Sequence, residues 1–256
     1  MTVSRPGRPL QKKQVNLIVP EWPAPASIHA CTTLRQGGVS EPPYDSWNLA
    51  GHVGDDPEHV RQNRGLLRKY LQLPAEPSWL EQVHGTQVVD LAGAGGEAVA
   101  DGCYTAQPGR VCAVLTADCL PVLICNSEGT EVSAAHAGWR GLAAGVIESA
   151  LDCFQSPDSD LLVWLGPAIG PDAFEVGAEV RAAFVHDLPE AASAFRPRPE
   201  NKWMADLYRL ARLRLSRRGI ERVYGGGYCT FQDSERFYSY RRAARTGRMA
   251  SLIWIE

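Results

Sequence analysis

A histidine surrounded by small residues lies in the segment SAAHAGWRGLAAG, residues 133–145. His136 has alanine on both sides, and Gly138 follows two positions later. Small neighbours leave room for another group to approach the imidazole, whereas a histidine packed in a core usually has bulky neighbours. We therefore expect a metal or a substrate to reach this ring, and we expect Ala137→Leu to block the site while the fold and much of the metal are kept.

Two other residues carry side chains that suit the same metal. His84 lies in the strand-like run WLEQVHGTQVV, and Gly85 after it permits the close approach of another group. Cys119 lies at the end of an apolar strand in LTADCLPVLIC, where Pro121 interrupts regular pairing and aims the thiol outward. Because the chain has only six histidines, a histidine-rich site has few other candidates.

Two imidazoles and one thiolate suit Zn²⁺, and three protein ligands leave a fourth position for water, as a catalytic site requires. Zinc lowers the pKa of bound water from about 16 towards about 7, which provides a nucleophile at neutral pH. The three residues lie 35 and 17 positions apart, which matches no short zinc-finger spacing. From the residues alone, a hydrogen-bonded structural histidine and a buried structural thiol stay open as alternatives.

The composition favours a small-molecule partner. A net charge of −3 over 256 residues provides no basic field for nucleic acid or for an acidic membrane. No apolar run reaches membrane-spanning length, and residues 15–19 are too short for the core of a signal peptide. Seven cysteines without a CxxC pair argue against a disulfide framework. We therefore expect a cytoplasmic enzyme that is a monomer or a weak oligomer.

The elements that must position these side chains alternate along the chain. Three helices are predicted, over residues 55–73, 142–154 and 206–219. The first has Asp56 as its N-cap, the second forms one continuous apolar stripe from Leu142 to Phe154, and Gly219 ends the third. The β-rich apolar runs cover residues 27–35, 111–125, 130–138, 161–170, 222–231 and 250–256.

Strands mixed with helices indicate an α+β fold, a layered sandwich of mixed β-sheets flanked by helices. We expect one domain over residues 15–256 after a flexible N-terminal segment of residues 1–14, which is polar and basic.

Seven motifs occur in a fixed order along the chain. They are TTLRQGGVS at 32–40, NLAGHVGDDP at 48–57, QVHGT at 82–86, TADC at 116–119, HAGWRG at 136–141, GPAIGPDAFEV at 166–176 and FYSYRRAARTGR at 237–248. In this order they resemble the YfiH-like family, also called the laccase-domain or multicopper polyphenol oxidase family. The resemblance runs from about residue 28 to the C-terminus. It implies a sandwich of β-sheets flanked by helices, with His84, Cys119 and His136 as zinc ligands. Phe174 stands where many relatives carry Cys or Tyr, and we interpret it as a packing change.

The resemblance also implies an activity. The family is associated with phosphorolysis of purine nucleosides such as adenosine, inosine and methylthioadenosine, and with adenosine deamination. A peptidoglycan-precursor editing hydrolase is the alternative. Oxidation of phenols by several coppers is disfavoured, because six histidines without a His-x-His pair cannot supply the imidazoles of such a centre. A His₂Cys site can still bind copper, since affinity for Cu²⁺ generally exceeds that for Zn²⁺.

Several polar residues are candidates for binding nucleoside and phosphate. Arg35 precedes Gly37 and Gly38, so a flexible loop with a cation can fold over an anion, although a surface arginine beside a turn is the alternative. Asn48 and His52 can hydrogen-bond a ribose or a base, but they also suit a plain turn. Arg140 lies at the start of a helix whose amides attract an anion.

The catalytic candidates are Cys119, Asp118 and Arg35, and Arg35 would hold phosphate for its attack on the anomeric carbon of the ribose. Asp118 is the nearest candidate for the general acid, although in an extended strand it would point away from Cys119. Cys119 is either a metal ligand or, in the hydrolase alternative, a nucleophile with His136 as its base. A non-catalytic binding module would need a fourth protein ligand, for which the candidates are His52, Cys112 and Cys125. A returning C-terminal loop brings further arginines to a phosphate, at positions 241, 242, 245 and 248.

Overall fold

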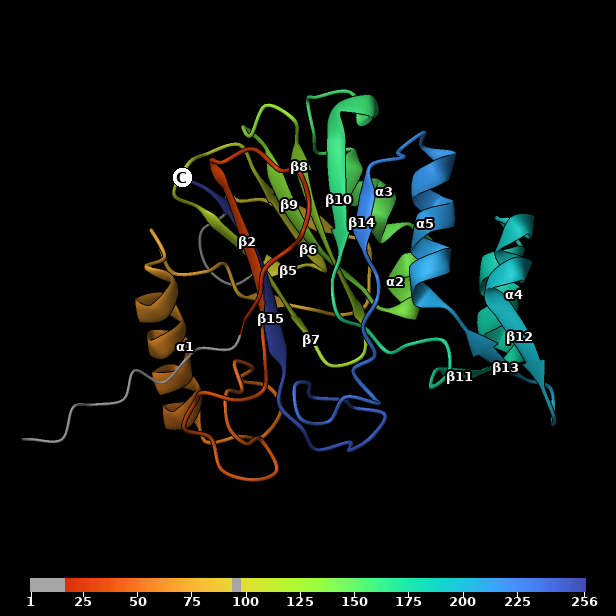
Figure 1. Ribbon diagram of the computed structural model, residues 1–256, viewed down its shortest axis with the longest axis horizontal. Helices are drawn as coiled ribbons and strands as arrows, with labels where there is room; N and C mark the ends of the chain where they lie inside the picture. Colours follow the sequence, from red (N-terminus) through yellow and green to blue (C-terminus); the bar gives the residue numbers. More distant parts are fainter. Residues whose placement is uncertain (1–16, 94–97) are drawn as a thin grey trace, which may run out of the picture.

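Two β-sheets packed face to face form the centre of the molecule (Figure 1). The computed structural model describes residues 17–93 and 98–256, so the predicted flexible segment 1–14 lies outside the described residues. The first sheet has four strands in the order β1-β2-β15-β7. Their bounds are Leu17–Ile18, Ile28–Thr33, Met249–Ile255 and Val111–Thr116.

The second sheet has six strands in the order β14-β10-β8-β9-β6-β4. Their bounds are Val223–Gly225, Leu161–Leu165, Leu120–Asn126, Val132–Ala137, Gly102–Thr105 and Val88–Asp90. There are two smaller sheets in the described residues. One has two strands, β3 and β5, and the other has three strands in the order β11-β13-β12. These strands are Leu80–Glu81, Ala98–Val99, Glu175–Gly177, Lys202–Ala205 and Phe195–Arg198.

Helices cover the outer faces of both sheets (Figure 1). Helix α1 (Pro57–Leu71) packs against the four-stranded sheet, and α2 (Trp139–Ala144), α3 (Val146–Leu151) and α5 (Leu207–Arg217) pack against the six-stranded sheet. Helix α4 (Ala178–Val185) accompanies β11, β12 and β13. Short 3₁₀ turns cover Asp158–Asp160 and Pro189–Ala194. The predicted α+β sandwich is therefore confirmed as four layers of helix, sheet, sheet and helix.

The alternation of side chains along β9 shows how the layers are filled. Ala135 and Ala137 face the helices, whereas Val132 and Ala134 pack between the two sheets. Every residue of β7, β8, β9 and β10 is buried. Burial on both faces explains why these strands appear in the sequence as continuous apolar runs rather than as alternating ones.

The helix predictions have mixed outcomes. Asp56 caps α1, since its carboxylate accepts a hydrogen bond from the amide of Glu58 at 2.8 Å, as the sequence predicted. The prediction of one helix over 142–154 is wrong. Gly145 has a φ of 104° in the left-handed region and separates α2 from α3. Gly219, with a φ of 75°, follows the end of α5 as expected.

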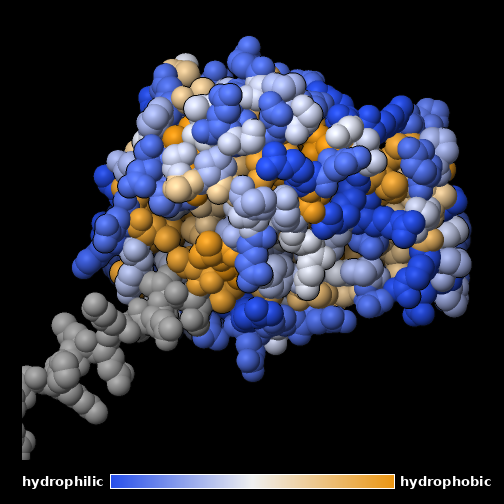
Figure 2. All heavy atoms as spheres, turned by 45° about the horizontal axis from the view of Figure 1, so that its top comes forward, coloured by the Kyte–Doolittle hydropathy of each residue, from blue (hydrophilic) through white to orange (hydrophobic). Residues whose placement is uncertain are grey.

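The surface shown in Figure 2 is mainly hydrophilic and the cysteines are free, as the composition predicts. Figure 2 shows a face that is mainly hydrophilic, with smaller apolar patches between the charged side chains. None of the helices in the described residues is long and apolar enough to cross a membrane. All seven cysteines are free, in agreement with the absence of a predicted disulfide framework.

Candidate functional site

Three segments bring His84, Cys119 and His136 together. His84 lies in the turn between β3 and β4, Cys119 immediately precedes β8, and His136 lies in β9. One ligand atom from each residue lies within 4.8 Å of the other two, and Cys119 Sγ is 3.8 Å from His84 Nε2. A tetrahedral zinc ion with bonds of about 2.3 Å to sulfur and about 2.1 Å to nitrogen separates such atoms by about 3.6 Å. The donor types therefore suit one such ion, and the Cys119–His84 separation is close to that of two ligands of the same ion.

The backbone at His84 differs from the strand-like run that the sequence predicted. Its φ is 61°, in the left-handed region that a residue with a side chain rarely adopts. The carboxylate of Asp101 holds this turn, because it accepts hydrogen bonds from the amides of Val83, His84 and Gly85 at 3.2, 2.9 and 2.6 Å. Three successive amides around one carboxylate form a compact anion-binding turn.

The same carboxylate orients the second imidazole. Asp101 Oδ1 lies 2.8 Å from His136 Nδ1, and both side chains are buried. With the proton on Nδ1 donated to Asp101, the lone pair of Nε2 is available to a metal. Burial raises the pKa of Asp101, but the hydrogen bonds from His136 and from the amides of Gly85 and His84 outweigh this effect. The pKa therefore lies below its usual value, and the carboxylate is anionic. Asp101 therefore positions two of the three candidate ligands.

The charges within the trio of His84, Cys119 and His136 favour the thiolate form of Cys119. Burial raises the pKa of Cys119, but the charge of His136 and hydrogen bonds from both imidazoles outweigh this effect and lower it to about 6. Burial lowers the pKa of His136, whereas the Cys119 thiolate and the hydrogen bond to Asp101 raise it to about 9. Without a metal, the site therefore holds a thiolate beside an imidazolium.

Alkylation of Cys119 tests this charge arrangement. In metal-free protein we expect iodoacetamide to modify Cys119 with a rate that is half-maximal near pH 6, because the thiolate is the reacting form. The rate should fall below this pH, and added Zn²⁺ should protect the residue. Mass spectrometry of the labelled peptide measures both effects. Cys153, whose pKa is raised by burial, should react only at higher pH, and a Cys119 profile that matched it would contradict the prediction.

Gly138 supplies the open space that the small residues around His136 suggested. A Cβ atom at this position would lie 2.7 Å from His84 Cδ2 and 3.2 Å from Cys119 Sγ. Ala137 plays no part in this, because its side chain is fully buried on the helix side of β9. The expectation that Ala137→Leu would block the site is therefore wrong, since alternate strand residues face opposite sides of a sheet.

Substitutions of Gly138 and Ala137 should separate an effect on metal affinity from an effect on core packing. Gly138→Ala should push the His84 ring aside and weaken metal affinity by about tenfold or more, the scale seen when the orientation of a ligand is disturbed. Ala137→Leu should overpack the core and destabilise the fold by about 1–3 kcal/mol, with little change in metal affinity. Competition with a metal-binding dye and thermal unfolding measure the two quantities. Equal metal affinities in both variants would refute this assignment.

A cavity of about 400 Å³ opens beside the trio. Its lining combines arginines with aromatic rings, namely Arg140, Arg241, Arg248, Trp139, Phe174 and Tyr240. Each guanidinium lies over one of these rings, with distances to the ring centroid of 4.4, 5.4 and 5.9 Å for the Arg140–Trp139, Arg241–Phe174 and Arg248–Tyr240 pairs. The wall can therefore contact both an anion and a flat heterocycle. Phe174 lines the cavity, so it does more than fill the core.

Contacts to the backbone fix two of these cations. Arg241 Nη1 donates to the carbonyl of Glu175 at 2.9 Å, and Arg248 Nη1 donates to the carbonyls of Thr246 and Gly247 at 2.9 and 3.0 Å. Burial lowers the pKa of Arg248, and the negative charges of Cys119 and Asp118 oppose that effect. Arg248 therefore lies within electrostatic reach of the proposed metal ligand.

Of the predicted substrate-binding residues, His52 and Arg140 line this cavity. Arg35 and Asn48 are not among its lining residues. Arg35 donates to the carbonyls of Asp45 and Ser234 and forms an ion pair with Asp45 at 3.0 Å. Asn48 is completely buried, and its Oδ1 accepts hydrogen bonds from the amides of Ala50 and Arg248. Asn48 therefore contributes to the site by fixing the backbone of Arg248.

Asp118 lines the cavity, but its carboxylate is already engaged. Oδ1 accepts a hydrogen bond from Thr230 Oγ1 at 2.6 Å, and Oδ2 accepts one from the amide of Arg241 at 2.7 Å. Its φ of 89° places it in the left-handed region, where the strand direction breaks between β7 and β8. These contacts tie the C-terminal arginine loop to the segment that carries Cys119.

Asp101 was not among the site residues predicted from the sequence. The signal was weak, since a single aspartate before a short strand has no distinctive spacing. The three candidates for a fourth protein ligand do not join the trio, because the group of metal-binding donors in the described residues contains only His84, Cys119 and His136. Cys112 is buried between the sheets, as is Cys125.

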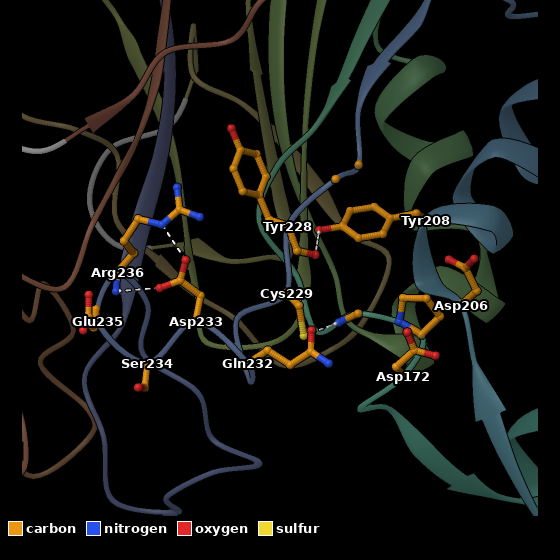
Figure 3. A pocket seen from close by; sticks show the side chains of 14 residues that line it. Asp172, Asp206, Tyr208, Tyr228, Cys229, Gln232, Asp233, Ser234, Glu235 and Arg236 are labelled. Atoms are coloured by element: carbon orange, nitrogen blue, oxygen red, sulfur yellow. Dashed lines mark hydrogen bonds and ion pairs between the residues drawn. The ribbon is translucent and has the colours of Figure 1, made fainter.

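Another cavity, of about 750 Å³, lies beside Cys229 (Figure 3). Three of its lining residues make contacts within the protein. Cys229 Sγ accepts a hydrogen bond from the amide of Gly170, Tyr208 donates to the carbonyl of Tyr228, and Arg236 pairs with Asp233. None of the three candidate ligands lines it. The cavity beside the trio is therefore the better candidate for chemistry.

Comparisons with known proteins identify the family of the chain. The family model described as multi-copper polyphenol oxidoreductase laccase matches residues 29–256. Purine nucleoside phosphorylase PA4543 from Pseudomonas aeruginosa is 56% identical over 240 residues, which cover 93% of this chain and 98% of that protein. Purine nucleoside phosphorylase YfiH from Escherichia coli is 55% identical over the same shares of the two chains.

Solved structures show the same fold. The Neisseria meningitidis protein NMB0706 superimposes with a TM-score of 0.91 at 49% identity, covering 94% of this chain and 99% of that one. YlmD from Geobacillus stearothermophilus has a TM-score of 0.85 at 32% identity, covering 90% and 93%. The resemblance seen in the motifs is thus confirmed, and the chain belongs to the YfiH-like family, whose sequence model is that of the multi-copper polyphenol oxidoreductase laccases.

Proposed function

We propose that this protein is a metal-dependent purine nucleoside phosphorylase with zinc bound by His84, Cys119 and His136. The observation that carries the proposal is the juxtaposition of a three-donor metal site with a wall of arginines and aromatic rings in one cavity. Three protein donors leave the fourth position of a tetrahedral ion to a ligand from outside the protein, as in catalytic zinc sites. The similarity to purine nucleoside phosphorylases from Pseudomonas aeruginosa and Escherichia coli supports the same activity.

Phosphorolysis makes two demands on the protein. Phosphate must approach the anomeric carbon of the ribose, where an oxygen–carbon bond forms as the carbon–nitrogen bond to the base breaks, and the departing purine takes up the electron pair of that bond. We assign Arg140, Arg241 and Arg248 to the phosphate, because guanidinium groups bind its oxygens through charge-assisted hydrogen bonds. A bound divalent ion supplies a Lewis acid that stabilises developing negative charge.

The aromatic side chains suit the purine. Trp139, Phe174 and Tyr240 present rings around the same cavity, and a flat heterocycle can stack on such surfaces. His52 lies at the cavity wall as a hydrogen-bonding group. Burial and the charges of Arg248 and Arg64 lower its pKa, so it is neutral at neutral pH and can donate to or accept from a ribose hydroxyl.

Adenosine deamination is a second candidate for the same metal site, since zinc deaminases also leave one coordination position to a non-protein ligand. Those enzymes use a free carboxylate as general acid and base. In this protein both oxygens of Asp118 and of Asp101 accept hydrogen bonds from protein groups. This arrangement favours phosphorolysis as the main reaction.

Product analysis tests the proposal. Zinc-loaded protein is incubated with adenosine or inosine, with and without phosphate, and the products are separated by chromatography. Phosphorolysis predicts free base and ribose 1-phosphate only when phosphate is present, whereas inosine formed from adenosine without phosphate would show deamination. His136→Ala, which should lose the metal, is the control for a contaminating enzyme. Absence of base, ribose 1-phosphate and inosine would overturn the proposal, and a peptidoglycan precursor is then the next substrate to test.

A further inference from the structure

A groove larger than the cavity beside His84, Cys119 and His136 adjoins that cavity and extends towards α1. It has a volume of about 980 Å³, and it shares His52, Gln82 and Leu115 with the cavity beside the trio. The cavity of about 400 Å³ is the part that contacts the metal ligands. A nucleoside and a phosphate bound next to the metal would leave the groove unused, so its composition indicates what else can bind.

One wall of the groove is a face of α1 that carries arginines. Arg61, Arg64 and Arg68 line it at a spacing of three and four residues, so they lie along one side of the helix. Arg64 is fixed in place, because its guanidinium lies 4.3 Å from the centroid of the Trp79 ring and its Nε donates to the carbonyl of Leu49. Arg61 pairs with Glu58 at the outer rim.

Arg68 has no comparable protein partner. Within residues 17–93 and 98–256, its guanidinium makes no hydrogen bond or ion pair. The acidic residues of the groove, Glu76 and Glu81, lie outside α1, and Glu76 accepts a hydrogen bond from Trp79 Nε1 at 2.8 Å. The helix face is thus the cationic side of the groove.

Gly65 leaves the helix backbone accessible between these arginines. Glycine in the interior of a helix costs about 1 kcal/mol relative to alanine. Outside the adjacent residues and the backbone of the helix itself, no described atom lies within 4 Å of the position that a Cβ atom would take at Gly65, so packing does not require a glycine there. The residue lines the groove. Its absence of a side chain lets a ligand approach the helix between Arg61 and Arg68.

We infer that the groove binds the phosphate chain of a purine nucleotide whose nucleoside part occupies the metal cavity. Guanidinium groups spaced along one helix face can bind successive phosphate groups, and His52 lies where the two spaces join. Placement of the nucleoside rests on the proposed function, whereas the anionic subsite rests on Arg64, Gly65 and Arg68. The protein should therefore bind purine nucleoside triphosphates more tightly than the corresponding nucleosides.

Calorimetry with ATP, adenosine and tripolyphosphate tests this inference on the full chain loaded with zinc. Arg68→Gln removes one cation that lines the groove, and Lys69→Gln removes an equal charge from the neighbouring exposed position, which does not line it. Loss of one charge-assisted contact should weaken ATP binding by about tenfold or more in Arg68→Gln. Lys69→Gln should bind ATP like the wild type, and adenosine binding should be unchanged in both variants.

Gly65→Gln provides a second, independent test. The substitution should raise the melting temperature, because it improves helix propensity and its Cβ atom has open space, yet it should weaken ATP binding by filling the groove. ATP that bound no more tightly than adenosine, or that bound equally to the wild type, Arg68→Gln and Gly65→Gln, would overturn the inference. Tripolyphosphate that bound as tightly as ATP would overturn the link to the metal cavity. ATP binding with the expected variant profile, but without phosphorolysis of adenosine, would refute the proposed function alone.

Discussion

Cys119→Ala should lose the bound metal and nucleoside turnover together. The two remaining imidazoles rarely hold a zinc ion without a third protein ligand, and a metal that binds the native state contributes to its stability. We therefore expect less than one tenth of the wild-type metal content after dialysis, no measurable turnover, and a melting temperature that no longer rises when zinc is added. Elemental analysis, product chromatography and thermal unfolding measure these three quantities.

Cys229→Ala is the matched control for that variant. Cys229 is also a free, partly buried cysteine, but it lies in the other cavity and does not join the metal-binding group (Figure 3). We expect wild-type metal content and turnover after this substitution. One equivalent of zinc retained by Cys119→Ala would refute the ligand set, whatever the turnover of the variant.

Asp101→Asn should be nearly as damaging, although it removes no metal ligand. Asp101 Oδ1 contacts the amide of His84 and His136 Nδ1, and Oδ2 contacts the amides of Val83 and Gly85. An asparagine amide group in the Oδ2 position would face two N–H donors. In the Oδ1 position it would donate to His136 Nδ1 and so place the imidazole proton on Nε2, where it blocks metal binding.

We expect this substitution to weaken metal affinity by about 10-fold to 100-fold and to destabilise the fold by about 1–3 kcal/mol. Metal titration and chemical unfolding measure the two effects. Asp90→Asn is the control, because Asp90 is an exposed carboxylate at the end of β4 that caps the amide of Ala92. Unchanged metal affinity in Asp101→Asn would show that the carboxylate only shapes the turn.

Local features made much of the fold predictable. Asp56 and Pro57 define the start of α1 through a side-chain cap and a fixed φ, both of which act within one turn of helix. Continuous apolar runs such as residues 111–125 identified buried strands, because strands buried on both faces carry no polar alternation. The break at Gly145 was missed, since glycine tolerates both a helical and a left-handed backbone and the sequence does not show which is used.

The arrangement of the site depended on contacts between distant residues. The left-handed turn at His84 is stabilised by Asp101, and the backbone of Arg248 is held by Asn48, 200 positions earlier in the chain. No local pattern encodes such contacts. The motifs nevertheless placed His84, Cys119 and His136 among few candidates, and the structure brings these three residues within reach of one ion.

The position of β15 has a consequence for the order in which the parts of the site can be completed. β15 pairs with β2 on one side and with β7 on the other, so residues 28–33 must wait for residues 249–255 before the four-stranded sheet can close. Pairing across such a separation in sequence is slow, because chain entropy is lost before the contacts compensate for it. The metal ligands and Asp101 all lie within residues 84–136, whereas Arg241 and Arg248 arrive with the last strand. The candidate metal-binding cluster can therefore form from one continuous part of the chain, whereas the arginine wall of its cavity is complete only after β15 has paired.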